Sequence, residues 1–534
     1  MSLTNLKISS AIFLFLVVKL VKPQVYPDKV VALNHVQIMF QYPQVKGAQI
    51  YKIRIAKKTE SAFDKNIIYE AIDSATAHLV SQKIKFGNKY CWKYEAYTTG
   101  KKIFSSKEFV FETANTKVEN MFKANITKYD SSKSLPGLVF LDNGVVIDRK
   151  GNLILISDSF GVEKRDFTMT LNGSITYLRN GIAIDQNLNG DIIWKSPKIK
   201  NDKYVVFDYH HDITKLKNGN YLSLCKVNDA NNESFNKKFN EAIIELDSVN
   251  NVVWLWREIE HITDTTGLPT SHLNSIYLDE KENKIFVSAR DFNTVFTVNR
   301  KTRKIDECIG KKINKDSEHY PQEWFSGQHS AQLVDNGNII LFNNNTMPGR
   351  GNVTSIMEMN RPNPQKRDIE MIFFYFYDFG KGENFCAKGG DINKLKNNNY
   401  LVSSSSYNRN FEMTANQEIV WECRPERLDT VSKTWSGMGS YRINFLETLY
   451  PSFFTLEFVY SNNKLTGFKI VNKGSSDDEY EIVMKNPAGK VIETINKVIL
   501  AGNGFRKTGD FSNTASIKVI PKSHPLNAKE KNVQ

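Results

Sequence analysis

Short runs in which apolar and polar residues alternate dominate the chain from about residue 25 onward. Examples are 36–40 (VQIMF), 51–55 (YKIRI) and 90–97 (YCWKYEAY). A period of two is typical of β-strands that bury one face. These runs predict an antiparallel β-sandwich over residues 25–115.

The middle of the chain repeats a hairpin pattern about every 60 residues. Segments 211–224 (HDITKLKNGNYLSL), 272–287 (HLNSIYLDEKENKIFV), 329–342 (HSAQLVDNGNIILF) and 390–403 (GDINKLKNNNYLVS) begin 61, 57 and 61 residues apart, and a weaker copy begins at Asn143. Each joins two short strands through an Asn/Gly or acidic turn. Because the period is long and no helical pattern intervenes, residues 116–445 are expected to form a β-propeller of five or six blades.

The repeat ends near residue 445, and new strand-like runs follow (FTLEFVYS, GFKIVNKG, EYEIVMKN and SIKVIPKS). They predict a small C-terminal β-sandwich with a tail over 446–534. The run 105–113 (SSKEFVFET), together with 90–97, resembles the end of a fibronectin type III domain. The predicted fold class is therefore all-β, a propeller between a fibronectin type III-like sandwich and a second sandwich.

Residues 1–24 carry Lys7 and then an apolar run over 8–18. That run is too short to span a bilayer and lies where a secretory signal belongs. We interpret 1–24 as a signal peptide, and expect an exported protein, periplasmic, secreted or at the cell surface, with no membrane span in its mature form.

Composition narrows the classes of partner. The net charge is +13, but the lysines are dispersed, and no zinc spacing or RNA-binding signature accompanies them, so nucleic acid is not expected as a partner. The five cysteines are scattered and odd in number, which argues against a disulfide framework and against CxxC chemistry. A homodimer stays open.

The histidines carry the chemical signal. Only nine exist, yet His211, His272 and His329 begin three consecutive repeats. First strands of propeller blades line the central channel, so these imidazoles should converge. Two other readings are open: the histidines could satisfy backbone groups, or could bind a metal with Asp212 behind them.

Two more side chains are placed near the histidines by the pattern. Arg290 lies one strand beyond His272, where a permanently charged fork could hold a tetrahedral oxyanion. Asn274 lies two residues after His272 and should share its strand face.

Segments 210–222, 271–290 and 327–342 together resemble the bacterial arylsulfate sulfotransferase family, in the right order. The resemblance implies six blades, a central active site, and a ping-pong transfer of a sulfuryl group from an aryl sulfate to a phenolic acceptor. It implies no PAPS, no other cofactor and no metal.

The same resemblance assigns roles. The histidine of the GQH motif, the nucleophile that becomes a sulfohistidine, matches His329. His272 and Arg290 match binders of the sulfuryl oxygens. The first motif matches His210 or His211, of which the register selects His211, leaving His210 and Asn274 as substrate-binding candidates. The rival hypotheses are a non-catalytic adhesion or carbohydrate-binding propeller, and a propeller hydrolase or lactonase with a central metal.

Overall fold

The computed structural model describes residues 25–533 except 158–159, 231–239, 264–269, 347–351, 364, 366–367, 378–381 and 463. Strands make up nearly all regular structure in this part of the chain. The helices described there are three-residue 3-10 turns: η1 (Phe63–Lys65), η2 (Val118–Asn120), η3 (Glu258–Glu260), η4 (Ser405–Tyr407) and η5 (Pro525–Asn527). None of them is long and apolar enough to cross a membrane. The all-β prediction is confirmed, while the expected signal peptide, 1–24, lies outside the described residues.

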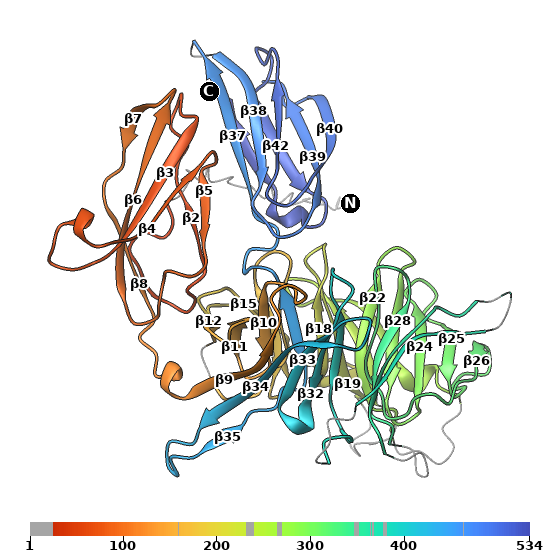
Figure 1. The fold of residues 1–534 in the computed structure, drawn as a ribbon. Helices are drawn as coiled ribbons and strands as arrows, with labels where there is room; N and C mark the ends of the chain where they lie inside the picture. Colours follow the sequence, from red (N-terminus) through yellow and green to blue (C-terminus); the bar gives the residue numbers. More distant parts are fainter. Residues whose placement is uncertain are drawn as a thin grey trace, which may run out of the picture.

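The N-terminal strands form two sheets, drawn in orange in Figure 1. The larger has the order β1-β8-β6-β3-β4 with β7 added to β6, and the smaller pairs β2 with β5. Their bounds are β1 (Val30–Leu33), β2 (Ile38–Gln41), β3 (Ile50–Lys57), β4 (Ile67–Asp73), β5 (Ala77–Val80), β6 (Lys89–Thr98), β7 (Lys101–Ser105) and β8 (Phe109–Thr113). Alternating buried residues of β6 and β8 meet Phe40 of β2, whose ring lies 5.1 Å from Trp92 and 5.7 Å from Phe111. The predicted period-two pattern thus places aromatic side chains between the sheets.

Six sheets follow one another within the described residues, and we number them in chain order. Sheet 1 is β10 (Leu138–Leu141), β11 (Val145–Asp148), β12 (Leu153–Ile156) and β36 (Ile443–Leu446); sheet 2 is β13 (Arg165–Met169), β14 (Ile175–Arg179), β15 (Ile182–Gln186) and β16 (Ile192–Lys195). Sheet 3 is β17 (Ile199–Lys200), β18 (Tyr204–Lys215), β19 (Tyr221–Asp229), β20 (Glu241–Leu246) and β21 (Val252–Arg257). Sheet 4 is β22 (Leu273–Asp279), β23 (Lys284–Ala289), β24 (Thr294–Asn299), β25 (Ile305–Gly310) and β26 (Glu318–Tyr320).

Sheet 5 is β27 (His329–Leu333), β28 (Ile339–Asn343), β29 (Ser355–Met359) and β30 (Met371–Phe376). Sheet 6 is β9 (Phe122–Tyr129), β31 (Asp391–Lys394), β32 (Tyr400–Ser404), β33 (Arg409–Met413), β34 (Ile419–Leu428) and β35 (Trp435–Gly437). The four predicted hairpins are the strand pairs β18–β19, β22–β23, β27–β28 and β31–β32. The weaker copy at Asn143 is also a hairpin, but it joins β11 and β12.

One strand from each sheet meets its neighbours in a closed ring: β36, β13, β18, β22, β27 and β31, each in contact with the next and β31 with β36. Two pairings distant in sequence close this ring. Strand β36 pairs antiparallel with β10 in sheet 1, and β9 pairs antiparallel with β34 in sheet 6. Each end of the central region therefore pairs with a strand from its other end. The closed ring brings its six strands together around one centre.

The apolar clusters lie between adjacent sheets. Along β28, Ile339 and Leu341 pack toward sheet 4, whereas Ile340 and Phe342 pack toward sheet 6. Burial on both faces explains why this strand is a continuous apolar run. Removing its side chains from water stabilises the fold by about 25 cal/mol per Å² of buried apolar surface.

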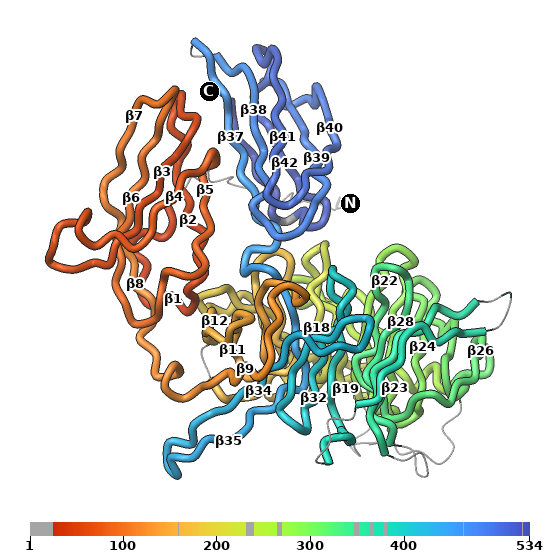
Figure 2. Tube along the Cα trace, viewed as in Figure 1, coloured from red at the N-terminus to blue at the C-terminus, as the bar shows by residue number. Residues whose placement is uncertain are grey.

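The C-terminal strands form two further sheets, blue in Figures 1 and 2. One is β37 (Phe454–Ser461), β38 (Lys464–Asn472) and β41 (Gly504–Thr508); the other is β39 (Asp478–Lys485), β40 (Val491–Ile499), β42 (Ser516–Pro521) and β43 (Lys529–Asn532). The tube view shows the N-terminal and C-terminal sheets beside each other. Lys473 pairs with Asp73 at 2.6 Å between them.

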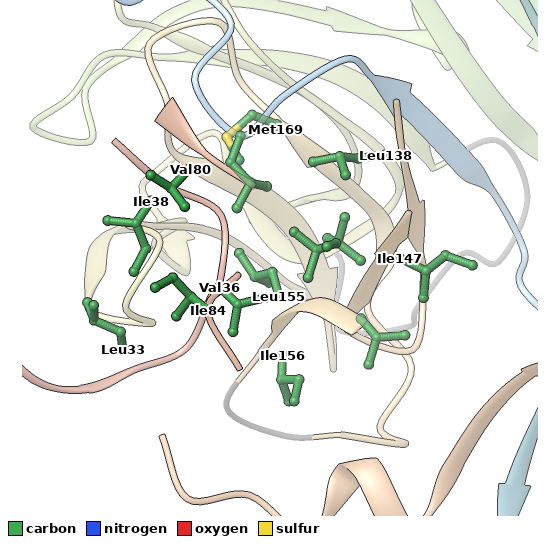
Figure 3. Close-up of a cluster of buried hydrophobic side chains, with 14 of the residues drawn as sticks. Leu33, Val36, Ile38, Val80, Ile84, Leu138, Ile147, Leu155, Ile156 and Met169 are labelled. Atoms are coloured by element: carbon green, nitrogen blue, oxygen red, sulfur yellow. The ribbon is translucent and has the colours of Figure 1, made fainter. Parts of the chain in front are cut away.

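The N-terminal sheets also pack on sheet 1. Figure 3 shows Val36 beside Leu155, and both belong to one continuous buried cluster that also contains Leu33, Val80 and Leu138. The apolar contact fixes the N-terminal sheets against the ring, away from its centre.

Candidate functional site

Five of the six ring strands carry a matched tetrapeptide at the point where they approach the centre of the ring. The matched tetrapeptides include Arg165-Asp166-Phe167-Thr168, His211-Asp212-Ile213-Thr214, His329-Ser330-Ala331-Gln332, Gly390-Asp391-Ile392-Asn393 and Tyr441-Arg442-Ile443-Asn444, with His272 before β22. The ring centroids of His211 and His272 are 5.2 Å apart, and Tyr441 lies 5.8 Å from His211 and 5.7 Å from His329. The three histidines singled out in the sequence therefore come together around Tyr441.

The backbone at these positions departs from a regular strand. His211 and His272 have φ of 61° and 52°, in the left-handed region, and Ser330 has 53°. The strand register shifts just after each histidine, between His210 and Ile213 in β18 for example. A bulge of this kind re-aims a side chain at a cost of about 1–3 kcal/mol for each left-handed residue. Its recurrence in three sheets is typical of a functional centre.

Hydrogen bonds fix the tautomer of His329. Asn344 donates its amide Nδ2 to the carbonyls of Cys386 and Gly389, both at 2.8 Å, so its Oδ1 must face the other way. That oxygen lies 2.8 Å from His329 Nδ1, and Gly327 O lies 3.1 Å from the same nitrogen. Because both neighbours are acceptors, Nδ1 carries the proton. Nε2 therefore keeps its lone pair, approached at 3.3 Å by the Gly389 N–H.

Burial keeps His329 neutral. The residue is 2% exposed, and burial lowers its pKa to about 3, although the Asn344 contact opposes the shift. The charge of Arg290 lowers the pKa further. At neutral pH Nε2 is thus an unprotonated nitrogen with nucleophilic capacity.

Arg290 lies in the turn after β23 and faces the same centre. Its backbone N–H donates to His272 O at 3.1 Å, its Nη1 donates to Asp291 Oδ1 at 2.7 Å, and its Nη2 lies 3.5 Å from Ala387 O. Ala387 belongs to the loop whose Gly389 contacts His329 Nε2. The guanidinium is therefore held beside the nucleophilic face of His329.

His210 and His211 are adjacent in β18, with their Nδ1 atoms 2.7 Å apart. One Nδ1 must donate and the other accept, so at least one imidazole exposes a protonated Nε2. Burial is the main cause that lowers the pKa of His210, to about 3, and the pKa of His211 well below its usual value. The pair is a neutral donor–acceptor couple, with both members at the centre rather than on opposite faces.

His272 is the most accessible of the group, with 37% of its side chain exposed. Burial lowers its pKa, while Asp291, whose Oδ2 lies 3.8 Å from its Nδ1, opposes the shift. Asp291 therefore links Arg290 and His272.

Asn274 takes a different position from the one that alternation predicts. A register shift between Leu273 and Ser275 breaks the alternation after His272. The Asn274 side chain is fully buried, and its Nδ2 donates to Gln328 O at 2.7 Å. It holds the residue before His329 instead of lining a cavity.

Behind the histidines, the buried Arg442 forms hydrogen bonds to several strands of the ring. Arg442 Nη2 donates to Asp212 at 2.9 Å and to Asn274 O at 2.8 Å, and Nη1 lies 3.2 Å from Asp166. Burial raises the pKa of Asp212 to about 7 even though Arg442 opposes the shift. The sequence suggested that Asp212 could stand behind histidines that bind a metal. In the structure its carboxylate accepts a hydrogen bond from Arg442. No group of three or more His, Cys, Asp or Glu in the described part of the chain has a geometry that could hold a metal ion.

A cavity of about 800 Å³ opens onto the site from sheets 2 and 3. Its lining includes His210, His211, His272, Arg165, Lys226 and Phe207. His329 and Arg290 are not among its lining residues, so the cavity reaches the site from the side of His211 and His272. A volume of this size accommodates a substituted aryl ring.

Four contributors to the site were not predicted from the sequence: Asn344, the Gly389 N–H, Arg165 and Tyr441. Arg165 and Tyr441 carry the same Xaa-Asp/Arg-Phe/Ile-Thr/Asn pattern as the histidine repeats, so that pattern could have found them. The hairpin register that pairs His329 with Phe342 also brings Asn344 back toward Gly327. The Gly389 amide depends on a loop conformation that no local pattern predicts.

All five cysteines are buried and free, in agreement with the absence of a disulfide framework. The carbonyl of Cys386 accepts a hydrogen bond from Asn344.

Fold and site together define an all-β protein with a buried centre of neutral histidines and an arginine, suited to handling an anionic group. The model of the arylsulfotransferase (ASST) family matches residues 112–442, well over half of the sequence. This chain belongs to the arylsulfotransferase family, and its membership supports aryl sulfotransferase activity.

Other comparisons add little. No curated protein matches the sequence. Among solved structures, it is similar to a Bacteroides caccae protein of unknown function (11% identity, 54% of this chain and 93% of that one, TM-score 0.36). It is also similar to a streptogramin B lyase (13%, 62% and 100%, 0.34) and to virginiamycin B lyase from Staphylococcus aureus (12%, 56% and 87%, 0.33). Scores this low carry no argument about function.

Proposed function

We propose that this chain is a PAPS-independent sulfotransferase that moves a sulfuryl group from an aryl sulfate to a phenol through a sulfohistidine at His329. The observation that carries the proposal is the hydrogen bonding of His329, which leaves Nε2 unprotonated beside Arg290. The six sheets are then six blades of a β-propeller. The N-terminal sheets are a fibronectin type III-like sandwich, and 1–24 is the signal of an exported protein.

In the first half-reaction, His329 Nε2 attacks sulfur and the bond from sulfur to the aryl oxygen breaks, leaving its electron pair on the phenolate. The sulfuryl group keeps its negative charge and the imidazole becomes cationic. Asn344 Oδ1 and Gly327 O, both at Nδ1, stabilise that positive charge. Arg290 binds the sulfuryl oxygens, where fixed cationic donors act most strongly.

The departing oxygen leaves as a phenolate toward the cavity, where the N–H of His211 or His272 stabilises its charge by a hydrogen bond. In the second half-reaction a neutral imidazole of this pair accepts the proton of the phenol as the phenol oxygen attacks sulfur, and the bond between sulfur and Nε2 breaks. That proton then passes to the released phenolate through solvent. Arg165, whose guanidinium lies 5.1 Å from the Tyr441 ring centroid at the cavity wall, adds positive potential near the aryl oxygen. Protons and charge balance over the cycle, and no other reactant is needed.

The test uses the full chain with 4-nitrophenyl sulfate, with and without phenol, and follows 4-nitrophenolate release. His319→Ala, a histidine in β26 outside the site, is the control for His329→Ala. We expect one equivalent of release without phenol, repeated turnover that requires phenol, an acid-labile mass increase of one sulfuryl group on the wild type without phenol, and none of these in His329→Ala. Repeated turnover without phenol would favour a hydrolase, and silence with several aryl sulfates would favour the non-catalytic adhesion or carbohydrate-binding alternative.

A further inference from the structure

Two buried glutamates lie beneath the segment that carries His272. Glu241 begins β20 and is 8% exposed, and Glu258 begins η3 and is fully buried. They flank the open end of the β20–β21 hairpin, where Ala242 pairs with Arg257, and meet at Ser271, the residue before His272. The mechanism above uses neither glutamate.

The glutamates form hydrogen bonds with the residues on both sides of His272. The hydroxyl of Ser271 lies 3.3 Å from Glu241 Oε2 and also bonds Glu258 Oε2. On the other side, the N–H of Leu273 donates to the same Glu241 Oε2. His272 itself has a φ of 52°, a left-handed conformation that its neighbours must hold in place.

Counting donors locates a proton. Glu241 Oε2 accepts the Leu273 N–H and faces Ser271 Oγ, and Glu258 Oε1 accepts the Glu241 N–H at 2.9 Å. A hydroxyl has one hydrogen, so Ser271 can donate to only one of the two carboxyl groups and must accept from the other. Because Glu241 Oε2 is already an acceptor, the arrangement is satisfied when the proton lies on Glu258 Oε2 and Ser271 donates to Glu241.

We propose that Glu241 and Glu258 share one proton through Ser271, and that this singly protonated pair is a positioning device that holds His272 in its reactive conformation. The inference rests on the proposed function only for the role of His272. Glu241 lies at the wall of the cavity and Glu258 lies outside its lining. Both act on His272 through the backbone at residues 271–273.

The surroundings favour one proton over none. Burial raises the pKa of Glu241 to about 8 and that of Glu258 to about 7, and the charge of Glu258 raises the pKa of Glu241 further. Loss of the shared proton would leave two buried anions competing for one hydroxyl. The repulsion would be relieved by movement of Ser271 and Leu273, and with them His272.

Among the described residues of the neighbouring elements, no cation is free to compensate a negative charge on both glutamates. Lys226 on β19 is the cation whose charge reaches Glu241, and it pairs with Asp208 at 2.9 Å. Arg257 on β21 pairs with Asp229 at 2.8 Å. On the remaining sides, burial raises the pKa of the Cys225 thiol on β19 and lowers that of His272, so both stay neutral.

The decisive variant is Glu258→Gln. An amide at this position can accept the Glu241 N–H and donate to Ser271, so it copies the protonated carboxyl but cannot lose its proton. Glu260→Gln, in the same 3-10 turn but with 54% of its side chain exposed, is the matched control. The wild type and the control should lose kcat about tenfold per pH unit above the apparent pKa of the pair. Glu258→Gln should keep the neutral-pH kcat within about threefold and lack that alkaline limb.

An alkaline limb that persists in Glu258→Gln, or a wild type without one, overturns the proposal. A second variant, Ser271→Ala, removes the shared hydroxyl and covers the case in which Glu258→Gln does not fold. It should lower kcat about tenfold at neutral pH and displace the limb, and an unchanged limb overturns the proposal.

An infrared comparison separates this proposal from the proposed function. The difference spectrum between the wild type and Glu258→Gln at neutral pH should contain the carbonyl stretch of one protonated carboxyl, whether or not the chain transfers sulfate. A difference spectrum without that band overturns the proton-sharing pair while leaving the transferase proposal untouched.

Discussion

Replacing Asn344 tests whether the tautomer of His329 controls the reaction. The side chain is fully buried and makes three hydrogen bonds, one accepted from His329 and two donated to the carbonyls of Cys386 and Gly389. Asn344→Leu removes all three while keeping the branched shape of the side chain. A buried group left without a partner costs about 1–3 kcal/mol. Since His329 Nδ1 retains Gly327 O, the two orphaned carbonyls dominate, and the free energy of unfolding should fall by about 3 kcal/mol.

The kinetic effect of the same change is separate from the effect on stability. Loss of one hydrogen bond worth about 1–1.5 kcal/mol reduces the preference for a protonated Nδ1 by about tenfold. The Gly389 N–H still faces Nε2 and opposes a proton there. We therefore expect a fall of up to about tenfold in the burst rate of 4-nitrophenolate release, with little change in KM, measured at saturating donor under conditions where the variant is fully folded.

Asn344→Asp is the matched comparison. It keeps an acceptor at His329 Nδ1 but loses the donors to both carbonyls, so its stability should fall at least as far as that of Asn344→Leu. Its carboxylate should raise the pKa of His329 above about 3 and preserve the tautomer. Equal burst rates in the two variants, or a wild-type rate in Asn344→Leu, would refute the tautomer argument.

Three further predictions follow from the site. Arg290→Gln should lower kcat about a hundredfold by removing a fixed cation from the sulfuryl oxygens, whereas Arg165→Gln should lower it about tenfold and most for aryl sulfates with poor leaving groups; a rate series over substituted phenols distinguishes the two. Gly390→Ala should cost about 3 kcal/mol in urea unfolding, because φ is 104° and a Cβ would lie 2.3 Å from the ring of Phe342. The pKa of His329 is about 3 when folded and about 6.5 when unfolded, so the unfolded state binds the extra proton and stability should fall as pH drops from about 6.5 to 3. His329→Gln should reduce that slope by up to one proton, and an unchanged slope would show that this histidine is protonated in the folded state.

Strand periodicity and turn chemistry were enough to predict the all-β class, the four central hairpins and the convergence of His211, His272 and His329. Those features are local, and local patterns express them. The same logic misplaced Asn274, because alternation assumes a regular strand and the chain inserts a bulge immediately after His272. Asn344 and Gly389 reach His329 through a hairpin end and a loop, so their contribution depends on tertiary contacts that no short motif encodes.

Arg442 connects closure of the ring with the geometry of the site. It immediately precedes β36, the last strand of the ring, which completes sheet 1 by pairing with a strand about 300 residues earlier. The side chain binds Asp166 and Asp212, each next to a residue that faces the centre, and also binds the backbone of Asn274, whose amide holds Gln328 beside His329. The guanidinium is therefore bonded to three ring strands at once. An open ring would leave these buried aspartates without their cation, and it would release the starts of the strands that aim the histidines. The site can thus assemble only when the ring is closed, which couples the catalytic geometry to folding of the whole central region.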